Sequence, residues 1–172
     1  MTTTDGTRTD ESVLEEFLAR RAEAQQAKDI DGLMSCYAPD AVYYDVVPPL
    51  RFTGTEEIRR NFLRWFDGYL GPITLETHDR TLVVSGDAAF AHMLHRDTGE
   101  RKGGVQASIW VRESVCLRRT GDGDGERGGE RGGERDGHGA PGGWRITHEH
   151  VSIPVDPTTF RVWLPADKDQ PA

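Results

Sequence analysis

Two glutamates stand on strand faces that are otherwise apolar, and their positions suit proton-transfer chemistry. With the alternation of an extended chain, Glu113 shares a face with Ile109, Val111, Val115 and Leu117, and Glu149 shares one with Thr147, Val151 and Ile153. Two carboxyl groups held close together raise the pKa of one of them, which is a common acid–base arrangement. The alternative is that either glutamate lies in water at an open end of the sheet.

The string His148-Glu149-His150 places two imidazoles on one face of a strand, which raises the question of a metal. Zinc needs a third protein ligand, and the sequence contains no HExxH motif. His92 and His95 are three residues apart on a predicted strand and therefore face opposite sides. The alternation puts the two imidazoles on the face opposite Glu149, with Trp144, Ile146 and Ser152, and beside Trp110, Arg112 and Ser114. We therefore expect no metal and no other cofactor, and interpret this face as a hydrogen-bonded outer sheet surface.

Other kinds of catalytic site have no sequence support. No GxSxG or Cys–His signature is present, so nucleophilic hydrolysis is not indicated. No GxGxxG follows a strand, so a dinucleotide fold is not indicated. Cys36 and Cys116 form no CxxC and are predicted to be reduced, partly buried residues.

The elements that must position these residues are helices first and then a sheet. Apolar residues at helical spacing predict helices over residues 11–27, 30–37 and 56–69, with Thr55 as the N-cap of the third. Strands are predicted over residues 41–47, 73–84, 87–97, 105–119 and 144–153, and turns join the last four into an antiparallel meander. This order predicts an α+β domain with the helices on one face of a curved sheet.

The apolar stripe of the first helix continues onto polar residues. After Val13, Leu14, Phe17 and Leu18, the next positions on the stripe are Arg21 and Gln25. One interpretation is that the second half of this helix borders a cavity. The other is that the stripe shifts to Ala22 and Ala24 and leaves Arg21 in solvent.

Length and composition predict one domain between two tails. The chain has 172 residues, and residues 11–163 are assigned to the domain, with polar or Pro-rich tails at 1–10 and 164–172. Residues 121–143 repeat Gly, Glu and Arg and offer almost no apolar surface to bury. We predict that this insertion is a disordered loop inside the domain.

The charge balance excludes several classes of partner. The formal net charge is −8, without the basic stripe that a nucleic-acid-binding protein needs or the basic amphipathic segment of a membrane-surface protein. The sequence has no run of about 18 apolar residues that would cross a membrane. The polar N-terminus does not resemble a signal peptide, so a cytoplasmic location is the expectation.

Three strings resemble one superfamily. They are AKDIDGLMSCYAPDAVYYDVVPPLRFTGTEEI at 27–58, GDAAFAHMLHRDTG at 86–99, and WVRESVCLRR at 110–119 followed by WRITHEHVSIP at 144–154. Together they resemble the nuclear transport factor 2-like superfamily, in particular SnoaL-like proteins and ketosteroid isomerase homologues. The last pair is also similar to the association domain of calmodulin-dependent kinase II. The resemblance implies a cone-shaped α+β barrel, with three N-terminal helices packed on a curved antiparallel sheet.

The resemblance also implies roles for particular residues. Asp45 falls where ketosteroid isomerases place the carboxylate that moves a proton, although on its own it also reads as a turn residue ahead of Pro48. The first-helix tyrosine of that family aligns near Arg21 and its protonated aspartic acid near Val115, whose side chain cannot donate a hydrogen bond. The family match puts Glu113 and Glu149 on the concave side with Asp45, so Arg21 and Glu149 would assist Asp45.

In that superfamily the concave mouth is an apolar pocket, and the convex face often forms a homodimer. The pocket is expected to hold a hydrophobic small molecule and to be lined by Tyr43, Trp65, Phe66, Glu113, Val115 and Val151. The implied function is an isomerase, cyclase or lyase step on a carbonyl-bearing substrate. The alternative is a module that binds a small ligand or assembles as a dimer, without catalysis.

Overall fold

A computed structural model describes residues 9–120 and 141–162. The elements, in chain order, are α1 (Asp10–Ala27), α2 (Ile30–Met34), β1 (Tyr37–Tyr44), β2 (Phe52–Thr53), α3 (Gly54–Asp67), β3 (Thr74–Ser85), β4 (Ala88–Arg101), β5 (Val105–Arg119), a 3-10 turn (Pro141–Gly143) and β6 (Trp144–Ser152). The predicted order of helices before a sheet is confirmed.

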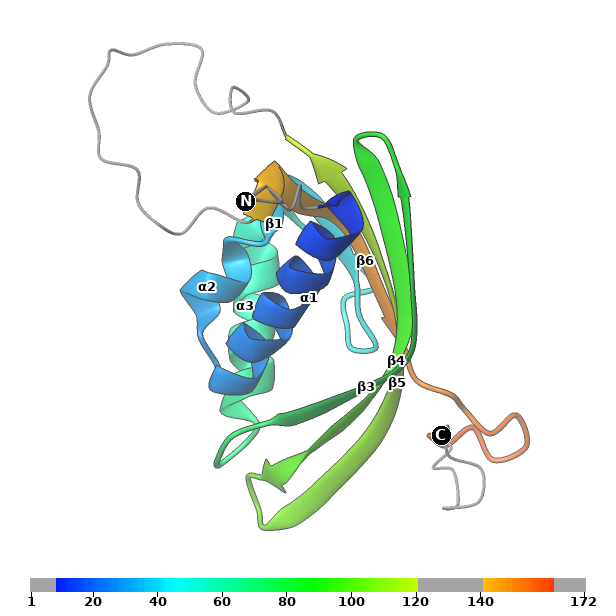
Figure 1. Cartoon of the computed structure of the whole chain (residues 1–172). Helices are drawn as coiled ribbons and strands as arrows, with labels where there is room; N and C mark the ends of the chain where they lie inside the picture. The colour runs from blue at the N-terminus through cyan, green and yellow to red at the C-terminus, as the bar shows by residue number, and fades with distance from the viewer. Residues whose placement is uncertain (1–8, 121–140, 163–172) are drawn as a thin grey trace, which may run out of the picture.

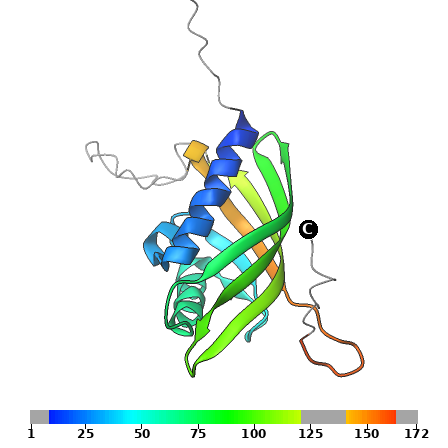
Figure 2. The ribbon, with the colours of Figure 1, turned by 60° about the horizontal axis from the view of Figure 1, so that its bottom comes forward.

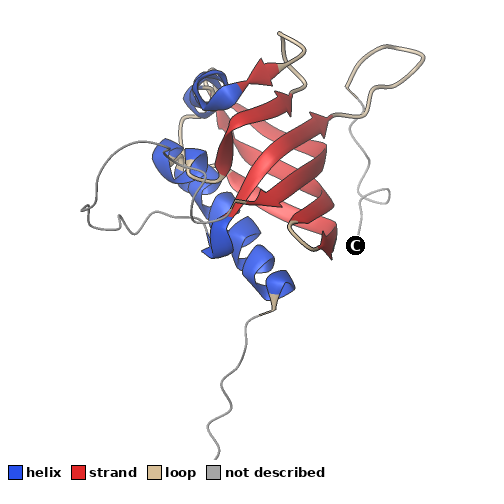
Figure 3. Cartoon of the chain, turned by 90° about the horizontal axis from the view of Figure 1, so that it is seen from above, coloured by secondary structure: helices blue, strands red, loops and turns tan. Residues whose placement is uncertain are grey.

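The six strands form one curved sheet in the order β2-β1-β6-β5-β4-β3. Strands β3 to β6 pair antiparallel, as the turns between them predict, and β1 joins the sheet parallel to β6. All three helices lie on the concave face of this sheet (Figures 1 and 3), and α1 runs across its long strands (Figure 2). This is the predicted cone-shaped α+β architecture, and the buried apolar residues fill the space between its two layers.

The second helix is shorter than predicted, and the first strand begins earlier. The prediction extended the helix to Tyr37, but α2 ends at Met34 and Tyr37 already pairs with Ile146 of β6. Pro39 disfavours helical backbone in the residue before it, and the parallel partner fixes the extended form. The strand ends at Tyr44 rather than at Val47, so Asp45 follows the strand instead of lying within it.

The third helix begins at Gly54, and its N-cap is Thr53 rather than Thr55. The carboxylate of Glu57 accepts a hydrogen bond from the Thr53 backbone N–H at 2.7 Å, which anchors the helix start at this residue. The short strand β2, which the prediction missed, pairs with β1 just before this start. At the other end the helix stops at Asp67, two residues before the predicted Tyr69.

A bulge in β6 changes which residues face the helices. Leu117 pairs with Ile146, but the preceding Cys116 pairs with His148, so Thr147 is an extra residue in the ladder. Trp144 and Ile146 are consequently on the concave side and fully buried. The expectation that they share the outer face with His148 is wrong, because simple alternation does not hold across a bulge.

Several predicted segments lie outside the described residues. These are residues 1–8 and 164–172 of the two tails, residue 163 at the end of the domain, and residues 121–140 of the insertion. The insertion was predicted to reach residue 143, but Pro141–Gly143 form a 3-10 turn beside α1, where the Thr120 N–H and hydroxyl both donate to the Gly143 carbonyl. Among the helices of the described chain, none is long and apolar enough to cross a bilayer.

Candidate functional site

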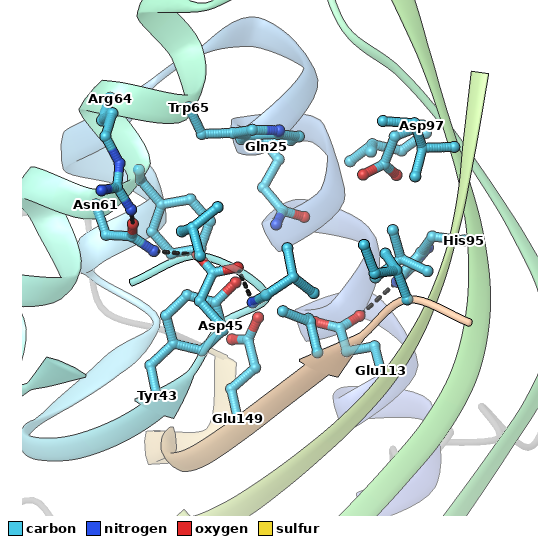
Figure 4. Close-up of a pocket in the computed structure, with 18 of the residues that line it drawn as sticks. Gln25, Tyr43, Asp45, Asn61, Arg64, Trp65, His95, Asp97, Glu113 and Glu149 are labelled. Atoms are coloured by element: carbon cyan, nitrogen blue, oxygen red, sulfur yellow. Dashed lines mark hydrogen bonds and ion pairs between the residues drawn. The ribbon is translucent and has the colours of Figure 1, made fainter. Parts of the chain in front are cut away.

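A cavity of about 510 Å³ opens between α1, α3 and the concave face of the sheet. Its aromatic wall comes from β1 and α3, and its aliphatic wall comes from β3, β5 and the end of β6. Polar side chains project into it from every side, as Figure 4 shows. The polar and aromatic lining consists of Gln25, Tyr43, Asp45, Asn61, Phe62, Arg64, Trp65, Tyr69, His95, Asp97, Arg101, Glu113 and Glu149.

Arg21 lies buried behind the cavity, between its two glutamates. Nη2 of Arg21 is 2.8 Å from Oε1 of Glu113 and 2.7 Å from Oε1 of Glu149. Tyr37 donates its hydroxyl hydrogen to the other oxygen of Glu149. One cation therefore holds two carboxyl groups in fixed positions at the inner end of the cavity.

The two glutamates are not equivalent, because a single Arg21 charge serves both. Burial alone would raise the pKa of Glu113, but Arg21 and the hydrogen bond from His95 together hold that pKa well below its usual range. Burial raises the pKa of Glu149, and the neighbouring Glu113 charge adds to the rise against the opposing effect of Arg21. The pair can therefore keep one ionised carboxylate and one carboxyl that holds a proton near neutral pH.

His95 extends this network toward the edge of the sheet. Its Nε2 is hydrogen-bonded to Oε2 of Glu113, and its Nδ1 lies 3.1 Å from the Thr77 hydroxyl. Because an ionised Glu113 can only accept, Nε2 carries a hydrogen. The Thr77 hydroxyl, which can both donate and accept, pairs with Nδ1. Glu113 is thus fixed by partners on both sides.

Asp45 follows β1, the strand that pairs with β6, and lines the cavity from that side. One carboxylate oxygen accepts from the Asn61 amide and the other from the Val46 backbone N–H at 2.6 Å. Arg64 of α3 in turn donates to Asn61, so the orientation of the carboxylate is set by α3. Asp45 and Glu149 face the same space in Figure 4.

Tyr43 lies close to both of these carboxyl groups. It pairs with Glu149 across the β1–β6 ladder and stacks on Phe62 of α3. Burial raises the pKa of Tyr43 well above its usual value, and the nearby Glu149 and Asp45 raise it further. Its hydroxyl is therefore a neutral donor, and no hydrogen bond joins it to any residue that the structure describes.

Two further polar side chains line the cavity without a partner among the described residues. They are Gln25 of α1, which is 8 % exposed, and Asp97 of β4. Oδ1 of Asp97 is buried with no hydrogen-bond partner. Burial raises the pKa of Asp97 to about 7, with His95 opposing the rise and Glu113 adding to it.

The raised pKa of Asp97 predicts a pH dependence of stability. Between the unfolded pKa of 3.8 and the folded pKa of about 7, the unfolded chain gives up a proton that the folded chain keeps, so the free energy of unfolding falls as pH rises. Asp97→Asn should remove this loss and melt about 3 °C or more above the wild type at about pH 8, with little difference near pH 4. Melting curves across this range test it. The exposed Asp40→Asn should show no such trend, and parallel curves for wild type and Asp97→Asn would contradict the prediction.

The structure brings most of the predicted site residues to one cavity. Tyr43, Trp65, Val151 and the three predicted carboxylates Asp45, Glu113 and Glu149 line it. Phe66 and Val115 are buried in the core beside it. Arg21 is neither solvated nor on the cavity wall, whereas Gln25, further along the same stripe, reaches the cavity.

Sequence reasoning missed Tyr37, Asn61, His95 and Asp97 as members of the site. Strand alternation could have indicated two of them as inward-facing, since His95 and Asp97 share a face with the buried Ala91 and Met93. The other two depend on contacts between distant segments. Tyr37 had been placed in a helix, and Asn61 is one polar residue on the buried side of α3.

The outer histidines lie on the convex face. Nδ1 of His148 is 2.9 Å from the Val42 carbonyl oxygen, and Tyr44 packs edge-on against both His148 and His150. Within residues 9–120 and 141–162, no three His, Cys, Asp or Glu side chains are grouped so that they could hold a metal ion.

Comparison with known proteins identifies relatives of this fold. The model of a family described as "SnoaL-like domain" matches residues 14–123. An NTF2-like protein of unknown function from Pseudomonas putida is 26 % identical, with a TM-score of 0.72 over 91 % of this chain and 95 % of that one. No curated protein matches the sequence.

Two more distant structures share the fold. One is a putative dehydratase of the NTF2-like family from Streptomyces avermitilis, 18 % identical, with a TM-score of 0.65 over 86 % of this chain and 97 % of that one. The other is a ketosteroid isomerase-like protein from Erwinia carotovora, also 18 % identical, with a TM-score of 0.64 over 84 % and 96 % of the two chains.

Proposed function

This chain belongs to the SnoaL-like domain family, and from that premise we propose that its cavity binds a small, largely apolar carbonyl compound and moves a proton next to the carbonyl group. The reaction class is an isomerase, cyclase or lyase step. The observation that carries the proposal is the placement of three groups in one cavity: the accepting carboxylate of Asp45, the proton-holding carboxyl of Glu149, and the free hydroxyl of Tyr43 close to both.

Each group has a defined part in the proton transfer. Asp45 accepts the proton from the carbon next to the carbonyl, and the C–H electron pair moves onto the carbonyl oxygen. The hydroxyl of Tyr43 and the carboxyl of Glu149 donate hydrogen bonds to that oxygen as it becomes negative. Arg21 is a positioning residue, since it does not line the cavity and its side chain donates hydrogen bonds, among the described residues, to Glu113, Glu149 and Tyr37.

The enolate formed in this way has three outcomes that fit the reaction class. Return of the proton from Asp45 to a different carbon gives an isomer. Attack of the enolate carbon on an electrophilic carbon of the same molecule gives a ring. Expulsion of a hydroxyl group, which leaves as water with the proton that Asp45 took up, gives an alkene, the outcome of a dehydration. Among the structures that share the fold, one is a putative dehydratase and another is ketosteroid isomerase-like.

A hydrogen-exchange assay tests the proposal without knowledge of the natural substrate. A ketone that stabilises the protein in a thermal-shift screen, with 1-tetralone as the first probe, is incubated with protein in D2O. Deuterium uptake at the carbon next to the carbonyl is followed by mass spectrometry. We expect wild-type protein to accelerate uptake and Asp45→Asn to slow it by about 100-fold or more.

The matched control is His92→Asn, an exposed residue on the convex face that should leave the exchange rate unchanged. Thermal shifts with the probe show whether each variant still binds it. If the probe binds but wild type and Asp45→Asn exchange it equally fast, Asp45 is not a base. The non-catalytic alternative, a protein that only binds a small ligand, would then hold.

A second proposal concerns self-association, because the convex face carries exposed apolar side chains. Phe90 is 46 % exposed and Val83, its cross-strand partner, is 41 % exposed. We propose that this face forms a homodimer, with the cavity left free on the other side of the sheet. Phe90→Lys should convert a dimer to a monomer in light scattering after size exclusion, whereas the exposed Leu50→Lys, away from this face, should not. A monomeric wild type would refute the proposal.

A further inference from the structure

Gln25 and Asp97 differ from the other carboxyl-bearing side chains that line the cavity. Both oxygens of Asp45, Glu113 and Glu149 accept hydrogen bonds from the protein. In contrast, within the described chain, no hydrogen bond or ion pair reaches the side chain of Gln25 or of Asp97. They project into the cavity from two different elements, α1 and β4 (Figure 4).

Unpaired polar groups in such a place are costly. A buried donor or acceptor without a partner loses its hydrogen bonds to water and gains nothing in exchange. An apolar residue at position 25 would avoid this cost, because it would continue the apolar stripe of α1 into the core. Two such groups aimed into one cavity indicate that their partners come from the ligand.

We propose that Gln25 and Asp97 form a second polar subsite, which binds a neutral hydroxyl group of the ligand at a distance from the carbonyl. The placement of the carbonyl beside Asp45 and Tyr43 rests on the proposed function, whereas the subsite itself rests on the two unpaired side chains. A hydroxyl group both accepts and donates, so it can take a hydrogen from the Gln25 amide and give its own to the Asp97 carboxyl.

Other ligand groups fit this pair less well. A carboxylate would be repelled by Asp97 and by the ionised Glu113, which both line the same cavity. An amine donates hydrogen bonds well but accepts them poorly, so it can serve the Asp97 carboxyl but not the Gln25 amide N–H. A protonated amine would also be repelled by Arg101, which lines the same cavity with its guanidinium carbon 4.6 Å from the centroid of the Tyr69 ring.

The walls near the two polar side chains define the rest of the ligand. Trp65 and Tyr69 of the α3 side and Leu75 of β3 line the cavity with apolar surface. A flat hydrocarbon skeleton suits these walls. The ligand class is therefore a ring compound with a carbonyl group at one end and a hydroxyl group at the other.

Matched ketones test this directly. Dissociation constants are measured by calorimetry for 1-tetralone, 6-hydroxy-1-tetralone and 6-amino-1-tetralone. We expect wild type to bind the hydroxyl compound about 5- to 10-fold more tightly than the parent ketone, the gain from a well-made pair of hydrogen bonds. Gln25→Met and Asp97→Ala should reduce this preference to about 1, and Asp97→Asn, which still forms hydrogen bonds, should keep most of it.

Asp45→Asn separates this proposal from the proposed function. It should abolish proton exchange and leave the hydroxyl preference intact. If wild type prefers the hydroxyl compound but catalyses no deuterium exchange, the subsite is supported and the proposed proton transfer is refuted. Three results would each overturn the subsite. Wild type could bind the parent and hydroxyl compounds equally, or it could bind the amine more tightly than the hydroxyl compound. The hydroxyl preference could also be unchanged in both Gln25→Met and Asp97→Ala. Circular dichroism checks that each variant is folded.

Discussion

Arg21→Met is expected to lower the free energy of unfolding by about 3–5 kcal/mol, the usual cost of breaking a buried ion pair from one side. Arg21 is 3 % exposed and is the shared partner of Glu113 and Glu149, which are buried as deeply. Without it, the ionised Glu113 and its neighbour Glu149 remain in the interior with no guanidinium beside them. Denaturant titration followed by tryptophan fluorescence measures the change.

Three comparisons show that the loss arises from the carboxyl groups that Arg21 no longer neutralises. Arg20→Met, at the exposed neighbouring position, should change stability little. Replacing both glutamates by glutamine in the Arg21→Met background should recover part of the loss, because neutral amides cost less to bury. Acidification should also favour the single variant relative to wild type, since protonation neutralises its uncompensated carboxylates. An Arg21→Met protein as stable as wild type at neutral pH would contradict the geometry.

Trp144→Ala is expected to cost about 3–5 kcal/mol, because a large buried ring leaves a cavity. Trp144 is fully buried, and Arg119 stacks on its ring with the guanidinium carbon 4.7 Å from the centroid. Trp144→Phe, which keeps part of the volume, should lose less. Thermal and denaturant melts of the two variants give the ranking.

This prediction tests which face of β6 carries Trp144. On uninterrupted alternation Trp144 would lie with His148 on the convex face, where truncation costs little. Phe160→Ala, which truncates an aromatic side chain that is 84 % exposed, is the matched control and should stay within about 1 kcal/mol of wild type. If Trp144→Ala were equally mild, the bulge at Thr147 would be misplaced.

The broad architecture could be read from local patterns. The change from helical to alternating periodicity gave the element order, and turn residues such as Ser85-Gly86-Asp87 gave the antiparallel meander. What could not be read depends on pairing between distant segments. The parallel contact of β1 with β6 determines that Tyr37 is extended, and the bulge at Thr147 appears only in the register with β5.

The same division applies to the site. Glu113 and Glu149 were recognisable as charges on apolar strand faces, and Asp45 through its family resemblance. The role of Arg21 could not be recognised from the sequence. An arginine that is buried between two carboxyl groups looks there like any other arginine on a helix. Asp97 carried the alternation signal, but only the cavity shows that its carboxyl has no partner in the described chain.

The place of β6 in the sheet also governs when the site can exist during synthesis. Arg21 and Glu149 are 128 residues apart in the chain, and β6 lies between β1 and β5. Until β6 has left the ribosome, no strand connects β1 to the meander of β3, β4 and β5. Arg21 also lacks Glu149, one of its two carboxyl partners, until then. A nascent chain stalled before residue 144 therefore has the helices and most of the strands but no closed sheet. It should be open to proteolysis and bound by chaperones, and protected once the last strand is inserted.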